Sequence, residues 1–379
     1  MPGRQHRIVV KIGGSTLTTA HYTLRYKRLR ALVAEIAQLT TMGYLPIVVS
    51  SGAVPAGFGA LRWSRYPLTV PEKQAAASVG QGALMHLYQQ HFARYQLLVA
   101  QILLTQDDFS IRSRFVNIRN TMEMLLQHRV IPIVNENDTI TVDGIKVGDN
   151  DTLGALVATA VGAERYIILS DVDGLYTANP QQHPDARLIP VVESITPEIE
   201  AISGEKGSVG ATGGMRTKIK AARIATAAGI EVIIANGETK DILPQIVQDK
   251  AVGTRFLPNK ERLPGKKSWI AFSTRVEGKI IIDAGAVQAV VQDNRSLLAT
   301  GITDIEGQFT EGSVVAICGP EGVELGRGIS NYTSADLHLF KGKHSQEIVS
   351  LVPALSNTST EVIHRDALAL YSPVAVPVE

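Results

Sequence analysis

Short runs of apolar, β-branched residues recur along the first two thirds of the chain. The runs predict strands at residues 7–12, 45–50, 97–104, 130–134, 166–170 and 231–235. Longer segments with apolar residues at helical spacing lie between most of them and predict helices at 24–41, 72–94, 112–128, 152–161 and 215–228. Nearly continuous apolar strands that alternate with helices are typical of parallel sheets covered on both faces. We therefore predict an α/β fold, a mainly parallel open sheet sandwiched by helices.

The pattern changes after residue 246. Segment 255–267 holds five basic residues and two prolines, which favours an exposed linker. Further on, short strands with frequent glycines are predicted at 279–282, 314–317 and 348–351, which indicates a small β-rich domain. The chain is thus divided into an α/β domain at 1–260, a linker at 261–275, a β-rich domain at 276–354 and a C-terminal tail at 355–379.

Composition and charge limit the classes of protein to consider. The 379 residues are 45% hydrophobic and 19% charged, with a formal net charge of +1. This composition is globular, and the net charge predicts neither nucleic-acid nor membrane binding. The start of the chain does not resemble a signal peptide, and no apolar run approaches the roughly 18 residues that cross a bilayer. With a lone Cys318, which cannot form an internal disulfide, we expect a soluble cytoplasmic protein.

Small, polar or charged residues follow most of the predicted strands. They occupy residues 11–15, 50–53, 135–139, 170–174 and 236–237. Open parallel sheets bind ligands at the carboxyl ends of their strands, so five such loops favour a binding site over ordinary turns. Glycines let backbone N–H groups approach an anion closely. Segments 11–15 and 50–52, and a third glycine-rich turn at 210–218, therefore suit phosphate or carboxylate groups.

The common nucleotide and metal motifs are absent from the sequence. No Gly-Lys pair is followed by Ser or Thr, and no Gly-x-Gly-x-x-Gly follows the first strand. Asp171 and Asp173 lack the further ligands of a calcium loop, and the nine histidines show no zinc spacing. We therefore expect no metal site formed by the protein alone. The acidic cluster at 149–151 precedes an apolar helix, so helix capping is the alternative to a binding role.

Taken together, these segments resemble the amino acid kinase family and, within it, the glutamate 5-kinases. The resemblance is carried by residues 10–15, 49–53, 131–138, 148–151, 169–176 and 210–218. The lysine-glycine start and the Asp-Val-Asp-Gly-Leu-Tyr stretch are similar to the wider family. The Asn-Glu-Asn-Asp loop and segment 210–218 narrow the resemblance to the glutamate 5-kinases. Ser170 stands where many relatives have Thr, which keeps the hydroxyl. The resemblance covers residues 7–260, and residues 279–351 resemble a PUA domain.

The resemblance implies that the γ-phosphoryl group of ATP is transferred to the γ-carboxylate of glutamate, the first step of proline synthesis, with proline as feedback inhibitor. It implies catalytic roles for Lys11, Lys218 and Asp151: the lysines flank the transferring phosphoryl group and Asp151 orients them. The accepting carboxylate is already ionised at neutral pH, so positioning and positive charge supply most of the catalysis. Mg²⁺ is expected to arrive mainly on the phosphates of ATP.

An amino-acid substrate needs hydrogen-bond acceptors for its ammonium group and donors for its carboxylate. Asp138, Asn135 and Asn150 suit the ammonium group, Ser51 suits a carboxylate, and Asp149 is a further candidate for substrate binding. The resemblance assigns nucleotide binding to a larger set: Lys11, Gly13, Gly14, Ser170, Asp171, Thr212, Gly213, Gly214, Met215, Arg216, Thr217 and Lys218. A homo-oligomer is also expected.

Two kinds of alternative remain open on the sequence. Other amino acid kinases act on acetylglutamate, aspartate or UMP; UMP calls for extra cationic residues, and acetylglutamate has no ammonium group for Asp138. The second alternative is an RNA-binding protein, because PUA domains often contact RNA. Residues 276–353 hold five basic and ten acidic residues, a net charge of −5. This is the wrong sign for binding a phosphate backbone, so we expect a structural or regulatory domain and no nucleic-acid partner.

Overall fold

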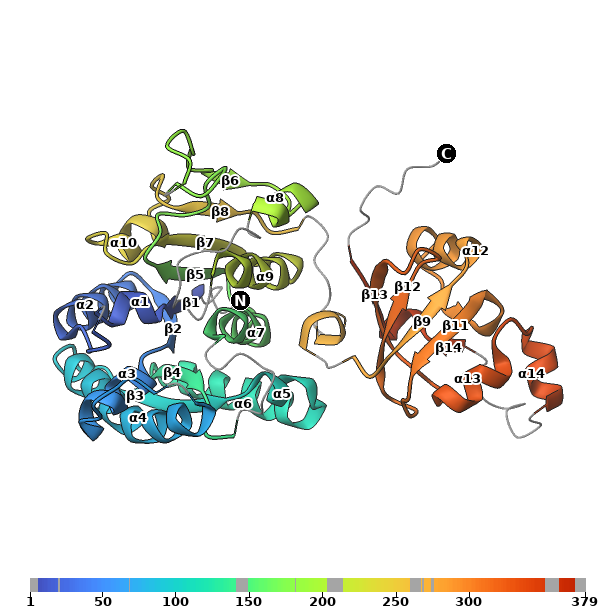
Figure 1. Ribbon diagram of the computed structural model, residues 1–379, viewed down its shortest axis with the longest axis horizontal. Coiled ribbons are helices and arrows are strands. Elements are labelled where there is room, and N and C mark those ends of the chain that lie inside the picture. The colour runs from blue at the N-terminus through green and yellow to red at the C-terminus, as the bar shows by residue number, and fades with distance from the viewer. Residues whose placement is uncertain are drawn as a thin grey trace. The chain divides into compact units, whose positions relative to one another are not determined.

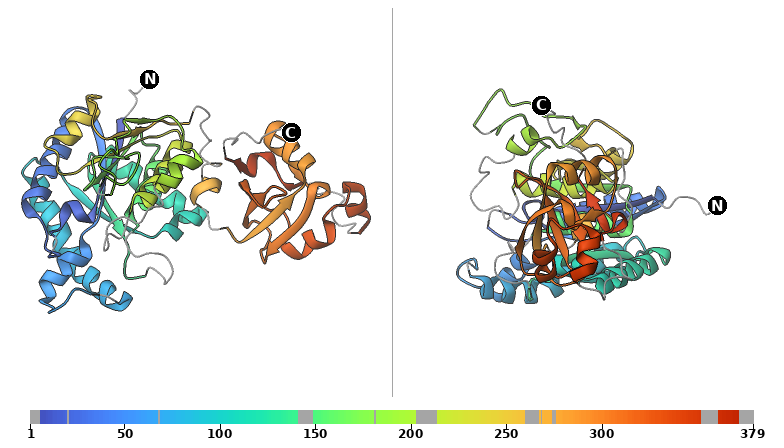
Figure 2. Two further views of the ribbon diagram at one scale, coloured as in Figure 1. Left: turned by 45° about the horizontal axis from the view of Figure 1, so that its top comes forward. Right: turned by 90° about the vertical axis from the view of Figure 1, so that its right-hand side faces the viewer.

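The computed structural model describes residues 6–19, 21–67, 69–140, 149–180, 182–202, 214–259, 267, 269–273, 276–351 and 361–371. The chain divides into two compact units. The first comprises Met1–Asp108 and Arg112–Arg262, and the second comprises Phe109–Ile111 and Leu263–Glu379. Most helices and strands of both units are labelled in Figure 1, and Figure 2 shows two further views.

The first unit is built on an eight-stranded sheet. In spatial order its strands are β3 (Val99–Leu104), β4 (Ile131–Glu136), β2 (Tyr44–Ser50), β1 (His6–Ile12), β5 (Arg165–Ser170), β7 (Glu231–Asn236), β8 (Thr254–Phe256) and β6 (Val191–Val192). The pairing between β7 and β8 is antiparallel, and the other neighbours pair in parallel. The predicted mainly parallel sheet is therefore confirmed.

Helices cover both faces of this sheet (Figure 1). On one face α2 (Tyr26–Thr41) contacts α4 (Val70–Ala93) and α10 (Ile242–Val247), and on the other α7 (Asn150–Val161) contacts α6 (Arg112–Gln127) and α9 (Met215–Ala227). The remaining helices are α1 (Gly14–Leu17), α3 (Ala53–Leu61), α5 (Gln106–Ser110) and α8 (Pro197–Ile202). No helix of the described residues is long and apolar enough to span a bilayer.

Side-chain alternation along β1 directs two kinds of residue to the two faces. Ile8, Val10 and Ile12 are fully buried in the core formed with α2, α4 and α10. Lys11 lies between two of them in the sequence, so its side chain points to the opposite face, where α7 covers the strand. The two-residue alternation of β1 thus places Lys11 on the face of the sheet that α7 covers, near the carboxyl end of the strand.

Helices α3 and α4 cross at backbone contact. A Cβ atom on Gly57 would lie 1.7 Å from the carbonyl oxygen of Ala76, and one on Gly80 would lie 1.9 Å from that of Ala53. Any side chain at these two positions would force the helices apart. Because α3 begins directly after β2, this crossing also holds the middle of α4 close to the carboxyl end of β2.

The second unit is a small β-rich fold. Its five-stranded sheet has the order β11 (Ile302–Gly307), β9 (Gly278–Ile282), β12 (Val314–Cys318), β13 (Glu324–Ile329) and β15 (Leu368–Leu370). Strands β10 (Leu297–Leu298) and β14 (Glu361–Ile363) form a separate pair, and the helices are α12 (Ala284–Val287), α13 (Ser334–Phe340) and α14 (Ser345–Leu351). Its core is apolar, with fully buried residues such as Ile280, Ile317, Val315 and Ile363.

Three expectations for this part of the chain need correction. The strand predicted at 348–351 is wrong, because these residues lie in α14, where the carboxylate of Glu347 accepts a hydrogen bond from the backbone N–H of His344. The predicted tail at 355–379 contains β14 and β15, and β15 completes the larger sheet against β13. Within the predicted linker, Trp269–Ser273 forms a π-helical turn that packs on β13 and β15 and buries Ile270 and Ala271. Burial of these apolar side chains is favourable, whereas an extended, solvated linker would leave them exposed to water.

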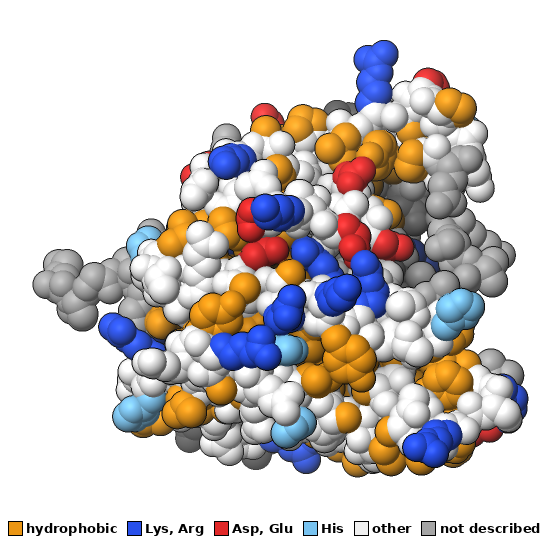
Figure 3. Space-filling model, turned by 90° about the vertical axis from the view of Figure 1, so that its left-hand side faces the viewer, with side chains coloured by type: hydrophobic (Ala, Val, Ile, Leu, Met, Phe, Trp, Pro, Cys, Tyr) orange, Lys and Arg blue, Asp and Glu red, His pale blue; other side chains and the backbone are white. Residues whose placement is uncertain are grey.

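The surface of the first unit mixes charges of both signs. On the face in Figure 3, Lys and Arg side chains gather across the middle, and Asp and Glu side chains lie beside them. Surface ion pairs of this unit include Arg25–Glu238 and Arg65–Glu72. Exposed pairs of this kind contribute about 0–1 kcal/mol each, so we assign them no functional role.

Candidate active site

A buried ionic cluster lies where the carboxyl end of β1 meets the first turns of α7 and α9. Lys11 Nζ lies 2.7 Å from Asp151 Oδ1, and Lys218 Nζ lies 3.3 Å from Asp151 Oδ2. Thr217 Oγ1 donates a hydrogen bond to the same Oδ2 at 2.7 Å. Relative exposure is only 6% for Lys11, 2% for Asp151 and 4% for Lys218. The structure therefore brings together the three residues predicted to be catalytic, and Lys218 is not a solvated helix lysine.

The electrostatics of this cluster favour a bound anion. Burial alone would raise the pKa of Asp151, but Lys11 and Lys218 outweigh it and lower that pKa to about 2. Burial lowers the pKa of Lys218, with the charge of Lys11 acting in the same direction and Asp151 opposing both. Two ammonium groups share one carboxylate, so the cluster keeps an excess positive charge in a place shielded from water. A phosphoryl group with developing negative charge is the ligand that such a site stabilises.

The backbone beside Lys11 is also suited to phosphate. Gly13 donates its N–H to the carbonyl oxygen of Leu169 at 2.9 Å, and a Cβ atom on Gly13 would lie 2.9 Å from that oxygen. Gly14 differs, because a Cβ atom there would meet only Ser51 Cβ, at 3.9 Å. The glycine at position 13 is required by packing on β5, whereas the glycine at position 14 leaves open space beside the chain for a ligand.

A second cluster, made of uncharged amides, lies at the carboxyl ends of β2 and β4. Asn135 Oδ1 accepts hydrogen bonds from the backbone N–H of Glu136 at 2.9 Å and from Asn150 Nδ2 at 3.1 Å. Asn150 Nδ2 also lies 3.1 Å from Ser51 Oγ, and Asn135 Nδ2 donates to Gln81 Oε1 at 2.9 Å. Two buried atoms of this cluster, Asn150 Oδ1 and Gln81 Nε2, have no hydrogen-bond partner among the described residues. Unpaired buried polar atoms are costly, which points to a ligand.

The two remaining acids predicted to bind substrate have different environments. Asp138 is buried, and its pKa is raised to about 7, first by burial and then by the negative charge of Glu136. A positively charged partner would relieve both effects. Asp149 caps α7, because its carboxylate accepts hydrogen bonds from the backbone N–H of Thr152 at 3.2 Å and from its hydroxyl at 2.7 Å. The capping alternative thus accounts for the observed contacts of Asp149.

The predicted nucleotide-binding residues lie beside the ionic cluster as far as the structure describes them. Ser170, at the carboxyl end of β5, is buried and donates to Asp171 Oδ1 at 3.0 Å. Gly214 precedes α9, whose first turns carry Met215, Arg216, Thr217 and Lys218. Thr212 and Gly213 lie outside the described residues.

The sequence did not indicate three of the residues that support this site. Gln81 binds Asn135, the hydroxyl of Tyr166 donates to the Asp151 carbonyl oxygen at 2.8 Å, and the hydroxyl of Tyr88 lies 2.8 Å from Ser50 Oγ. The tyrosines carry no signal beyond their hydrophobicity. Gln81 stands between Gly80 and Gly82, and glycines are unfavourable inside a helical pattern, but of the two only Gly80 is required by packing, and neither indicates the partner Asn135.

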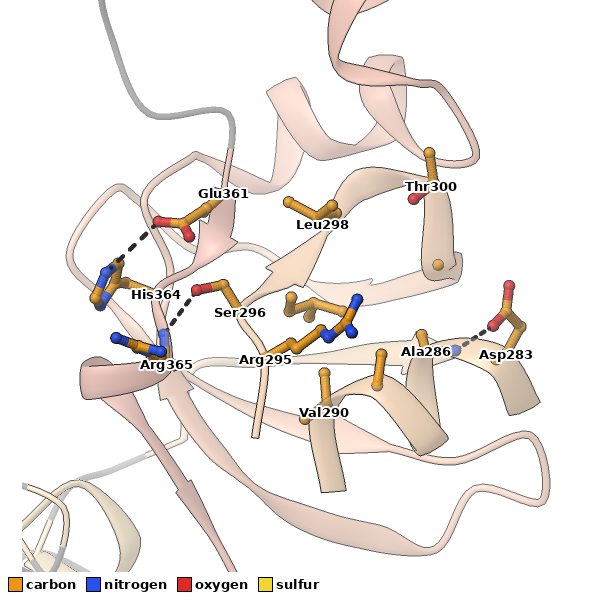
Figure 4. A pocket seen from close by; sticks show the side chains of 14 residues that line it. Asp283, Ala286, Val290, Arg295, Ser296, Leu298, Thr300, Glu361, His364 and Arg365 are labelled. Atoms are coloured by element: carbon orange, nitrogen blue, oxygen red, sulfur yellow. Dashed lines mark hydrogen bonds and ion pairs between the residues drawn. The ribbon is translucent and has the colours of Figure 1, made fainter. Parts of the chain in front are cut away.

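The described residues offer no group of three or more His, Cys, Asp or Glu side chains that could hold a metal ion. In the second unit, residues of the segments 283–301 and 361–365 line a cavity of about 700 Å³. Figure 4 shows its rim, where His364 faces Glu361 and Ser296 accepts a hydrogen bond from the backbone of Arg365. Arg295 and Arg365 are balanced there by Asp283 and Glu361, so the rim presents no strong charge of one sign.

Comparison with known proteins agrees with this geometry. The sequence model of the amino acid kinase family matches residues 6–236, and that of the PUA domain matches residues 278–352. The chain is 46% identical over 362 residues to a glutamate 5-kinase of Moorella thermoacetica, covering 96% of this chain and 95% of that protein. It is 46% identical to a glutamate 5-kinase of Trichlorobacter lovleyi, with 96% of each chain covered, and 47% identical to one of Deinococcus radiodurans, with 96% and 99% covered. The chain therefore belongs to the amino acid kinase family and, within it, to the glutamate 5-kinases.

Proposed function

We propose that the protein transfers the γ-phosphoryl group of ATP to the γ-carboxylate of L-glutamate and releases ADP and glutamyl 5-phosphate. The observation that carries this proposal is the pair of adjoining buried clusters, one with excess positive charge and one with a free amide acceptor. The first suits a phosphoryl group, and the second suits an ammonium group. The full-length similarity to glutamate 5-kinases supports the choice of substrate.

The reaction joins one carboxylate oxygen of glutamate to the γ-phosphorus of ATP and breaks the bond between that phosphorus and the ADP oxygen. No general base is needed, because a carboxylate with a pKa of about 4.3 is already ionised at neutral pH. Lys11 and Lys218 stabilise negative charge on the transferring group, and Asp151, held by Thr217 and by both lysines, fixes their positions. A Mg²⁺ ion bound with ATP would supply further charge neutralisation beside the two lysines.

The amide cluster favours a free amino acid over the alternatives within the family. Asn150 Oδ1 and the carboxylate of Asp138 are acceptors that an ammonium group satisfies and that acetylglutamate leaves unpaired. The residues of this cluster, Gln81, Asn135, Asn150 and Ser51, are all uncharged, whereas a nucleotide acceptor such as UMP calls for cations.

The reaction is tested by trapping its acyl phosphate. With glutamate, ATP and Mg²⁺ present, hydroxylamine is expected to give the hydroxamate, and ADP release is expected to require glutamate. Acetylglutamate and aspartate serve as competing acceptors in the same assay. ADP release that does not depend on glutamate, or that proceeds as well with another acceptor, would refute the assignment.

Proline is proposed to inhibit by competing with glutamate, because it carries the same α-carboxylate and an ammonium group. The test is initial velocity at low and high glutamate with and without proline, and inhibition that high glutamate does not relieve would contradict competition. We also propose a cytoplasmic homo-oligomer. The edge strand β3, which carries exposed Leu103 (37%) and follows exposed Leu98 (72%), supports self-association.

A further inference from the structure

Within the amide cluster, Gln81 is the residue whose position in the sequence is farthest from any strand of the sheet. It sits in the middle of α4 with 8% exposure, in a helix whose next residues Gly82 and Ala83 are exposed. The backbone contact between Gly80 and α3 brings it to the carboxyl end of β4, where its Oε1 meets Asn135 Nδ2 at 2.9 Å. A polar side chain is thus placed by helix packing beside the residues proposed to bind the amino acid.

The directions of the hydrogen bonds in this cluster follow from two backbone groups, the N–H of Glu136 and the carbonyl oxygen of Ser50, which accepts from Asn150 Nδ2 at 3.3 Å. The N–H of Glu136 can only donate, so the atom of Asn135 that it meets at 2.9 Å is the carbonyl oxygen Oδ1. Asn135 Nδ2 therefore faces Gln81, which must present its own oxygen. Asn150 must in turn present its Nδ2 to Asn135 Oδ1, which leaves Asn150 Oδ1 as the free, buried acceptor.

We propose that Gln81 is a positioning residue for the amino-acid substrate: by accepting from Asn135 Nδ2 it holds the Asn135–Asn150 pair in the orientation that offers Asn150 Oδ1 to the substrate ammonium group. This inference rests on the proposed function. Without an acceptor at position 81, Asn135 Nδ2 loses its hydrogen-bond partner, and the Asn135 amide keeps two of its three hydrogen bonds, both of them on Oδ1. An Asn150 amide turned the other way would present N–H groups to an ammonium ion, which repel it.

The test compares three variants in steady-state kinetics. Gln81→Met keeps the length and volume of the side chain but removes its acceptor, and the KM for glutamate is expected to rise about tenfold or more. The KM for ATP is expected to stay within about twofold and kcat within about threefold, because the ionic cluster is unchanged. Gln81→Glu is expected to restore the KM for glutamate to within about threefold of wild type, since a carboxyl oxygen accepts from Asn135 in either protonation state.

Gln89→Met is the matched control, because Gln89 is exposed on the same helix. It is expected to leave all three parameters unchanged. Wild-type enzyme without glutamate-dependent activity would overturn the proposed function, and this inference with it. With active wild type, a folded Gln81→Met of normal KM for glutamate overturns the inference alone. Equal increases in both KM values together with a lowered Tm, or no rescue by Gln81→Glu, would indicate a structural role and also overturn it.

Discussion

The ionic cluster and the amide cluster of the active site stabilise their buried polar groups in different ways. Around Asp151 the neighbouring groups are cations and a hydroxyl, and the charges balance only in part. The hydrogen-bond partners of the Asn135 amide are all neutral groups, and the cluster is ordered by the direction of its hydrogen bonds. Charge stabilises a group whose own charge changes during reaction, whereas directional amides recognise a group that keeps its charge. The difference predicts which substitutions alter rate and which alter substrate affinity.

Removing the shared carboxylate is expected to break the ionic half most severely. Asp151→Ala leaves two ammonium groups buried without a counter-charge, and the loss of a buried ionic partner costs about 3–5 kcal/mol. Urea unfolding measures this cost. Asp149→Ala, at the neighbouring capping position, is expected to cost only about 1 kcal/mol. Equal effects of the two substitutions would mean that the ionic cluster is not a special contributor to stability.

Removing one cation is expected to affect rate more than binding. If Lys218 stabilises the transferring phosphoryl group, Lys218→Ala loses about 3–4 kcal/mol of transition-state stabilisation, or roughly a hundred- to thousandfold in kcat. Lys218→Arg should rescue poorly, because a planar guanidinium does not replace a compact ammonium group in a tight site. Lys220→Ala, at an exposed position of the same helix, is the control. A folded Lys218→Ala with near-normal kcat would remove Lys218 from the catalytic residues.

The helix crossing that places Gln81 can be tested without altering any polar group. Gly80→Ala puts a methyl group into the backbone of α3, and overpacking of this kind costs about 1–3 kcal/mol. Gly82→Ala, where a Cβ atom meets nothing within 4 Å, is expected to be neutral or to stabilise by up to about 1 kcal/mol through helix propensity. Thermal melts of the two variants give the comparison. A harmless Gly80→Ala would show that the two helices are not locked by this contact.

Asp138 is a titratable neighbour of the amide half, and the effect of its titration is expected to be the smallest of those considered. Burial first, and the charge of Glu136 second, raise the pKa of Asp138 to about 7, so the group is mostly protonated at pH 6 and mostly ionised at pH 8. An ammonium group binds the ionised form, so the KM for glutamate should fall as pH rises from 6 to 8, by about tenfold at most. Asp138→Asn should abolish this dependence. An unchanged pH profile in that variant would assign the titration to another group.

Much of the first unit could be predicted because its central strands, such as β1, β2, β4 and β5, are buried on both faces. The six predicted strands correspond to β1, β2, β3, β4, β5 and β7, and the five predicted helices correspond to α2, α4, α6, α7 and α9. Lys11, Asp151 and Lys218 could be placed on one edge because the carboxyl ends of parallel strands meet there. The short strand β8, which is antiparallel to β7, was not predicted because three residues give no periodicity.

The second unit was harder to predict, for reasons of length and composition. Its strands have two to six residues, too few for alternation to separate them from short helices. Ile348 and Val349 are β-branched and favour a strand locally, yet the contact between Glu347 and His344 begins a helix there. Gln81 was missed for another reason: its partner Asn135 is 54 residues away, and helix crossing, which no local pattern reports, brings them together.

Three consecutive polar residues, Asp149, Asn150 and Asp151, lie at the start of helix α7, and each makes different contacts. Asp149 closes the end of the helix, Asn150 faces the amides and Asp151 faces the lysines. One turn of backbone thus joins the ionic cluster and the amide cluster, which share no side chain. We expect substitutions at position 150 and at its partners 81 and 135 to change the preferred acceptor molecule more than they change phosphoryl transfer. The insertion or loss of a single residue in this turn would disable both clusters at once.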